Sequence, residues 1–115
     1  MAVRIDCKLP NHEGEYVEFR ENPWPFKDRR AVMESSSDVA ALTVILGYIV
    51  GSGLKDVNGR AVDLTHKPPE TDGDGKPIAR DPLAALDDLD DAVVSWLIGA
   101  WFEARNKRSE VPKAG

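Results

Sequence analysis

The stretch from Asp38 to Val50, DVAALTVILGYIV, constrains the fold more than any other part of the sequence. It is too apolar to remain exposed to water, and at about 1.5 Å per residue a helix of this length is too short to cross a bilayer. Wound as a helix, it has a broad apolar wall (Leu42, Ile45, Leu46, Ile49 and Val50) and a narrow face of small side chains (Ala40, Thr43 and Gly47). Residues 35–38 offer N-cap side chains and Gly51-Ser52-Gly53 a stop signal. The sequence therefore predicts a long buried helix over residues 38–50, with room for a second helix against its small face.

Length and charge narrow the class of protein. The 115 residues fit one domain with one modest core. Lys and Arg number 15 against 20 Asp and Glu, and the basic residues do not segregate, which argues against binding to nucleic acid. Cys7 is the single cysteine, the first residues lack the apolar run of a signal peptide, and no stretch reaches the length of a membrane span. We therefore expect a cytoplasmic protein with no nucleic-acid or membrane partner.

Two β-hairpins are predicted. In the first, residues 3–8 alternate between apolar and polar side chains, and residues 15–20 do the same after a turn at residues 11–14. In the second, Asn58-Gly59 lies between two short runs of strand-forming residues. This dipeptide favours a two-residue turn with positive φ at both positions.

Shorter elements fill the remaining chain. Residues 26–34 are typical of a short helix with one thin stripe formed by Phe26, Arg30 and Met33. Residues 65–80 are rich in Pro, Gly and Asp, so we expect an exposed mobile loop there. Asp81-Pro82 can cap and open a short helical turn, and residues 109–115 are expected to form a disordered tail.

The last predicted helix covers about residues 91–107, and its apolar surface is unusually wide. Its apolar arc consists of Val93, Val94, Leu97, Ile98, Ala100, Trp101 and Ala104, with Trp96 on one side and Phe102 on the other. A helix that lies on a core needs a stripe of only about 100°, so we expect part of this arc to contact another molecule. Complete burial within the monomer is the alternative. Together these elements predict one α+β domain over residues 1–108, with a predominantly helical core of two long apolar helices, short helices and one or two hairpins.

Catalytic and metal-binding patterns are absent from the sequence. His12 and His66 both fall in predicted turns or loops, which indicates surface histidines. The acidic loop at residues 70–76 departs from a calcium-binding loop at several ligand positions. The four aspartates at residues 87–91 fit the positive end of a helix dipole better than an acid–base pair. We expect a protein that is not an enzyme and that holds no metal or cofactor.

One protein family has a similar order of short motifs and elements. In this chain they are an aromatic strand (Gly14 to Arg20), Trp24, Asp28-Arg29-Arg30, the apolar helix, the turn Val57-Asn58-Gly59-Arg60, and Leu86-Asp87-Asp88-Leu89 before the last helix. Over residues 14–104 this layout resembles the tail assembly chaperones of long-tailed, siphovirus-like bacteriophages. The resemblance implies a non-enzymatic helper in the cytoplasm of the infected bacterial host. Such a helper binds the tape measure protein and presents it to the tail tube protein, and this chain would be the short form of a pair related by frameshifting.

The candidate partner-binding residues follow from the wide apolar surface. A groove rimmed by aromatic side chains can receive an amphipathic helix, and aromatic anchors dominate interface energetics. The candidates are Trp96, Trp101, Phe102, Ile98, Ile45 and Ile49, and Trp101 could equally be a core residue. Two other classes of function remain open. One is a virion structural subunit, such as a head–tail joining or tail terminator protein that closes a homo-oligomeric ring. The other is a module that binds a host factor.

Overall fold

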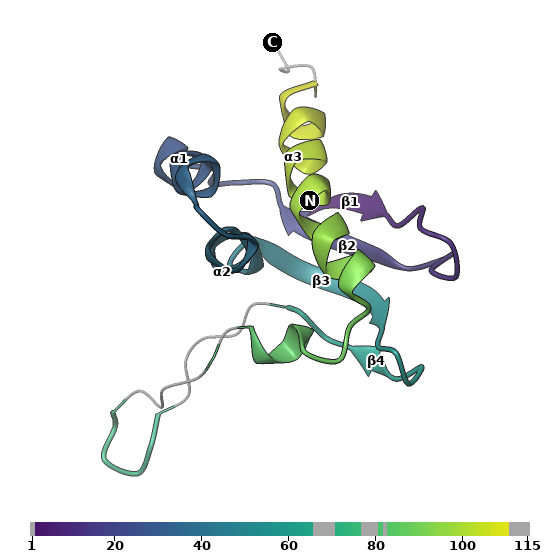
Figure 1. Ribbon diagram of the computed structural model, residues 1–115. Helices are drawn as coiled ribbons and strands as arrows, with labels where there is room; N and C mark the ends of the chain where they lie inside the picture. Colours follow the sequence, from purple (N-terminus) through teal and green to yellow (C-terminus); the bar gives the residue numbers. More distant parts are fainter. Residues whose placement is uncertain (1, 66–70, 77–80, 82, 111–115) are drawn as a thin grey trace.

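Four antiparallel strands form the sheet at the centre of the molecule, in the order β1-β2-β3-β4 (Figure 1). The computed structural model describes residues 2–65, 71–76, 81 and 83–110. The strands are β1 (Ala2–Asp6), β2 (Tyr16–Arg20), β3 (Ile49–Lys55) and β4 (Ala61–Val62). Their spatial order equals their order in the chain, and two helices are inserted between β2 and β3.

The described residues form three α-helices in addition to this sheet. They are α1 (Phe26–Glu34), α2 (Asp38–Leu46) and α3 (Asp91–Glu110), and a 3-10 turn, η1 (Ala84–Leu86), precedes α3. The predicted α+β class is confirmed, but α3 is the one long helix among the described residues and the core is shared between helices and sheet. Two residues of the predicted tail, Ser109 and Glu110, belong to α3. The remainder of that tail, residues 111–115, lies outside the described residues.

The first hairpin is confirmed. Val3 pairs with Phe19 and Ile5 with Val17, so the apolar positions of both strands share one face of the sheet. Ile5, Val17 and Phe19 are buried against the helices. The strands are joined through a turn in which Asn11 has φ 69° and Gly14 φ 84°. The left-handed region is accessible to Gly at little cost and to Asn more readily than to most residues.

The predicted helix over residues 38–50 is confirmed over residues 38–46 and wrong over residues 47–50. Its start is confirmed, because the Ser37 hydroxyl oxygen accepts the backbone N–H of Ala40 at 3.3 Å. The helix ends at Leu46, and Ile49 and Val50 begin strand β3 instead. β-branched side chains pack well in a sheet, and an apolar run of this length reads as helix or strand from sequence alone. Here Ile49 pairs with Phe19 of β2.

The predicted stop signal and small face are also corrected. Gly51-Ser52-Gly53 lies within β3, where a Cβ on Gly53 would stand 2.3 Å from a ring carbon of Tyr16. Glycine is required there by the tyrosine ring, not by a helix end. Ala40 and Thr43 are exposed to solvent, so no second helix of the described structure lies against that face.

The second hairpin is confirmed, with a longer turn than predicted. Leu54 pairs with Val62 across β3 and β4, and positive φ occurs at Gly59 (78°) but not at Asn58. The Asp56 carboxylate accepts the N–H groups of Asn58 and Arg60, both at 2.9 Å. The same hydrogen-bond pattern recurs in residues 72–76, where one carboxylate oxygen of Asp72 accepts the backbone N–H groups of Asp74 and Lys76. Residues 66–70 and 77–80 of the predicted loop lie outside the described residues.

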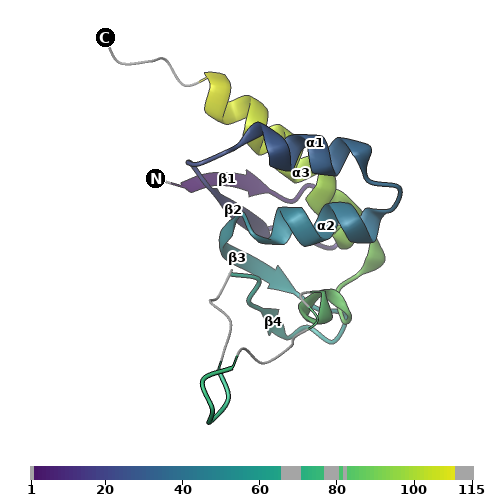
Figure 2. The same cartoon turned by 90° about the vertical axis from the view of Figure 1, so that its left-hand side faces the viewer.

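The helices form a layer on one face of the sheet. α3 crosses the sheet and contacts β1, α2 packs beside α3, and α1 packs on α2 (Figure 1). Seen from the left of that view, α1 lies in front of α3, so α1 is at the outside of the helical layer (Figure 2). The opposite face of the sheet carries Arg4, Tyr16 and Glu18, and Arg4 stacks on the Tyr16 ring at 3.9 Å.

Candidate partner-binding surface

Three of the six predicted partner-binding residues are core residues. Trp101, Ile45 and Ile49 each have 0% of their surface exposed and belong to the buried cluster between the helices and the sheet. They cannot contact a partner in this fold, and this part of the expectation is corrected. The physical reason is that Ile49 lies in the sheet, while Ile45 and Trp101 face it from α2 and α3.

The other three, Trp96, Ile98 and Phe102, lie half-buried at the borders of the α3 contact with the core. The centre of that contact is formed by Val93, Leu97, Ala100, Trp101 and Ala104. At 3.6 residues per turn, Ile98 and Phe102 fall on one flank of this stripe and Trp96 on the other. Together they leave partly exposed apolar surface on both sides of the helix.

An aromatic cluster joins α3 to the segments around α1 and α2. Trp24 stacks on Trp101 with ring centroids 5.2 Å apart, and Tyr48 meets Trp101 edge-on at 5.7 Å. Phe102 also meets Trp101 edge-on, at 5.1 Å. Offset stacks and edge contacts are the favourable geometries for such rings. The cluster therefore fixes the connector before α1, the turn after α2, and α3 relative to one another.

Polar groups hydrogen-bond at the edge of this aromatic cluster, and one of these bonds fixes which side of α1 faces the core. The Trp24 indole N–H donates to the Arg20 carbonyl at 2.7 Å, and the Arg20 guanidinium lies 4.0 Å above the Tyr48 ring. The Tyr48 hydroxyl donates to the Asp28 carboxylate at 2.6 Å. Burial, with the Asp28 bond adding to it, raises the pKa of Tyr48 to about 12. Asp28 thus faces inward, and the opposite side of α1 must face solvent.

The α1 outer face, which we define as Phe26, Arg29, Arg30 and Met33, is the most exposed apolar feature of a helix in the described structure. Phe26 is 65% and Met33 62% exposed, and Val39 at the start of α2 is 58% exposed. Only Val32 of α1 is buried. The spacing of apolar residues in 26–34 predicted the stripe but not the direction in which it faces. Arg30 in the middle of the stripe was the available signal, because an arginine is almost never fully buried without a partner.

A second polar constellation lies at the start of α3 and was missed from the sequence. The two ring nitrogens of His12 lie 2.6 Å from a Glu15 oxygen and 3.1 Å from an Asp90 oxygen. The second Glu15 oxygen accepts the Lys55 N–H at 2.8 Å, and the other Asp90 oxygen accepts the Ala92 N–H. The predicted surface histidine is corrected, because the His12 side chain is only 13% exposed. His66 lies outside the described residues.

The two carboxylate contacts favour the charged form of His12. An ionised carboxylate only accepts hydrogen bonds, so both contacts are satisfied when both ring nitrogens carry protons. The bonds to Asp90 and Glu15 accordingly raise the pKa of His12. The Ala92 N–H and the His12 bond lower the pKa of Asp90. This arrangement clamps the first turn of the chain to the start of its last helix.

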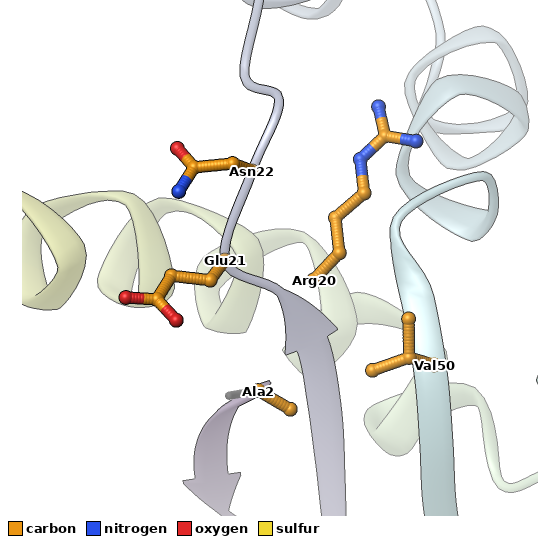
Figure 3. A pocket seen from close by; sticks show the side chains of 5 residues that line it. All are labelled: Ala2, Arg20, Glu21, Asn22 and Val50. Carbon is orange, nitrogen blue, oxygen red and sulfur yellow. The ribbon is translucent and has the colours of Figure 1, made fainter.

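A shallow hollow of about 510 Å³ lies at the end of the sheet, lined by Ala2, Arg20, Glu21, Asn22 and Val50 (Figure 3). Arg20 already donates to the Pro23 carbonyl at 3.0 Å, and both Glu21 and Asn22 have interactions of their own. Figure 3 shows the Arg20 side chain pointing away from those of Glu21 and Asn22. The hollow does not bring polar groups together on a ligand.

Fold and surface define a small α+β domain with an exposed apolar helix face. Among the described residues, no group of three or more His, Cys, Asp or Glu side chains is placed to hold a metal ion. No helix in the described ranges is both long and apolar enough to span a membrane. Comparison with protein-family models, with curated proteins and with solved structures finds no match to this chain.

Proposed function

We propose that this chain is a non-enzymatic tail assembly chaperone of a long-tailed bacteriophage. In this role it binds the tape measure protein in the cytoplasm of the infected host and promotes its assembly with the tail tube protein. The proposal combines the resemblance over residues 14–104 with the distribution of apolar surface in the structure. It requires no cofactor, nucleic acid or membrane.

The observation that carries the proposal is the exposed apolar surface of the helical layer. Phe26, Met33 and Val39 are each more than half exposed, and Trp96, Ile98 and Phe102 are half-buried. Single exposed apolar residues are ordinary, but Phe26 and Met33 share one face of α1, and such a face is suited to a protein partner. An amphipathic helix is the form in which a long helical chain would offer apolar side chains to such a surface.

The test is co-expression of the chain with the tape measure gene downstream of it, followed by affinity purification through a tag on the chaperone. We expect the tape measure protein to be retained by the wild-type chain and to remain in solution. A tagged, unrelated acidic protein of similar size is the control for nonspecific capture. No retention by the wild type would refute the proposed function.

Mass measurement of the purified chain separates this function from that of a virion ring subunit. A chaperone is expected as a monomer or small oligomer that changes mass on binding the tape measure protein. A discrete ring of this chain alone would favour the head–tail joining or tail terminator function.

A further inference from the structure

The α1 outer face combines apolar and basic side chains in one stripe. At about 100° per residue, Phe26 and Met33 fall almost on one line along the helix, and Arg29 and Arg30 fall on either side of it. The Arg29 guanidinium carbon lies 6.0 Å from the centre of the Phe26 ring. The face therefore offers two apolar contacts about two turns apart, flanked by two guanidinium groups.

The helix dipole of α1 does not explain the positions of these arginines. Basic side chains stabilise a helix near its C-terminus, yet the last turn of α1 contains none. Lys27, Arg29 and Arg30 all lie in the first half of the helix, near the positive end of its dipole. Asp28, the acidic residue of the first turn, faces the opposite way and binds the Tyr48 hydroxyl. The Nε atom of Arg29 is shielded from solvent and has no acceptor in the part of the chain that the structure describes.

We propose that the α1 outer face binds an acidic amphipathic helix of the tape measure protein. Apolar side chains of that helix would pack on Phe26 and Met33, and its carboxylates would accept hydrogen bonds from Arg29 and Arg30. Arginine and carboxylate form strong bidentate pairs, and these would give the face its specificity. The identity of the partner rests on the proposed function, whereas the acidic and amphipathic character of the bound helix rests on the face itself.

Because the chain is acidic overall, a preference for an acidic over a basic helix would identify a local basic surface as its cause. The chain carries a net charge of −5, so long-range electrostatics alone would attract a basic peptide and repel an acidic one. Preference for an acidic helix can then arise only from a local basic surface. Among the exposed large apolar residues, Phe26 and Met33 are those with arginines directly beside them on the same helix face.

The experiment uses two labelled synthetic helices of about 18 residues, or five turns. Both carry the same leucine face, and the polar face is glutamate in one and lysine in the other. By fluorescence anisotropy, we expect the wild-type chain to bind the glutamate helix at least about tenfold more tightly. Phe26→Ala with Met33→Ala should weaken that binding by a similar factor. Arg30→Gln should weaken it and reduce its sensitivity to salt.

Matched controls lie elsewhere on the surface. Val57→Ala removes an apolar side chain that is 68% exposed, and Lys76→Gln removes an exposed charge, so both should leave binding unchanged. Because Phe26, Met33 and Arg30 are exposed, their variants should melt at the wild-type temperature. Equal binding of the two peptides, or unchanged binding by the Phe26/Met33 double variant, would overturn the inference.

The same variants distinguish failure of this inference from failure of the proposed function. If the wild type prefers the glutamate helix but retains no tape measure protein, the proposed function is refuted and the chemistry of the face stands. If the tape measure protein is captured equally by wild type and by the Phe26/Met33 double variant, the chaperone function stands and α1 is not its binding surface.

Discussion

Helices α1 and α3 lie on the same side of the sheet and use their apolar residues in opposite ways. α3 turns Trp101 and Leu97 into the core with no exposed surface, whereas α1 buries Val32 and leaves Phe26 and Met33 in solvent. Apolar spacing alone does not separate the two cases. A polar contact contributes to the difference, since the Asp28–Tyr48 hydrogen bond holds the side of α1 that carries Asp28 and Val32 toward the core.

The largest expected difference between the two helices is in stability. Trp101→Ala should lower the free energy of unfolding by about 3 to 5 kcal/mol, because it opens a cavity at the centre of the aromatic cluster. Phe26→Ala should change it by no more than about 0.5 kcal/mol, because its side chain is exposed. Urea denaturation followed by circular dichroism measures both. Equal losses would mean that α1 contributes to the core as α3 does.

The flank of α3 should give an intermediate effect. Phe102 is half-buried and meets Trp101 edge-on, so Phe102→Ala should cost about 1 to 1.5 kcal/mol, roughly half the value for a fully buried side chain. The same denaturation experiment applies, with Phe102→Leu as the control that retains apolar volume. A loss as large as that of Trp101→Ala would place Phe102 in the core and remove it from any binding surface.

A stabilising substitution at Gly99 tests whether the solvent-facing side of α3 is free of contacts. A Cβ at Gly99 would have no atom within 4 Å, and Gly99 is exposed. Gly99→Ala should therefore raise the free energy of unfolding by about 0.8 to 1 kcal/mol through helix propensity alone. Gly53→Ala is the contrasting variant, since its Cβ would collide with Tyr16 and lower stability. Destabilisation by Gly99→Ala would show that this side of α3 is not free.

The smallest expected effect is a dependence on pH at the start of α3. The raised pKa of His12 means that its contribution to stability is complete below about pH 6.5 and is lost as pH rises through the folded value. The lowered pKa of Asp90 means that its contribution is present above about pH 4 and is lost as pH falls through the folded value.

Melting temperatures of the wild type and His12→Gln across pH 4 to 9 test this clamp. The wild-type advantage over the variant should be largest between about pH 4 and 6.5 and should shrink above that range. Asp90→Asn provides the matched removal of the other partner, and Asp87→Asn the control for lost charge in the same acidic segment. A difference between wild type and His12→Gln that is constant with pH would show that His12 is not charged in the fold.

Local patterns predicted the elements whose periodicity admits one interpretation. Alternation in residues 3–8 and 15–20 predicted the first hairpin and its buried face, and the wide arc of residues 91–107 predicted α3. The N-cap candidates at residues 35–38 predicted where α2 begins, and Ser37 is the residue that caps it. These features depend on neighbours within a few residues of each other, and for that reason they are legible in the sequence.

Features that depend on distant contacts were not predictable. The end of α2 is decided by pairing of Ile49 with Phe19, and the direction of α1 by Tyr48 binding Asp28. Trp101 is buried because Trp24 and Tyr48, from two other segments of the chain, pack on it. Of the six predicted partner-binding residues, the structure leaves Trp96, Ile98 and Phe102 accessible in part, and it adds Phe26 and Met33, whose outward direction follows from the same long-range bond.

The bond between His12 and Asp90 joins residues that are 78 positions apart. During synthesis the β1–β2 hairpin emerges long before Asp90. The contact of His12 with Asp90 can therefore form only after the residues at the start of α3 have been made. The first hairpin and the final helix thus come into contact only late in translation. A nascent chain halted before residue 90 would hold all four strands, α1 and α2 but would lack α3, so the core residues that α3 covers would be open to solvent.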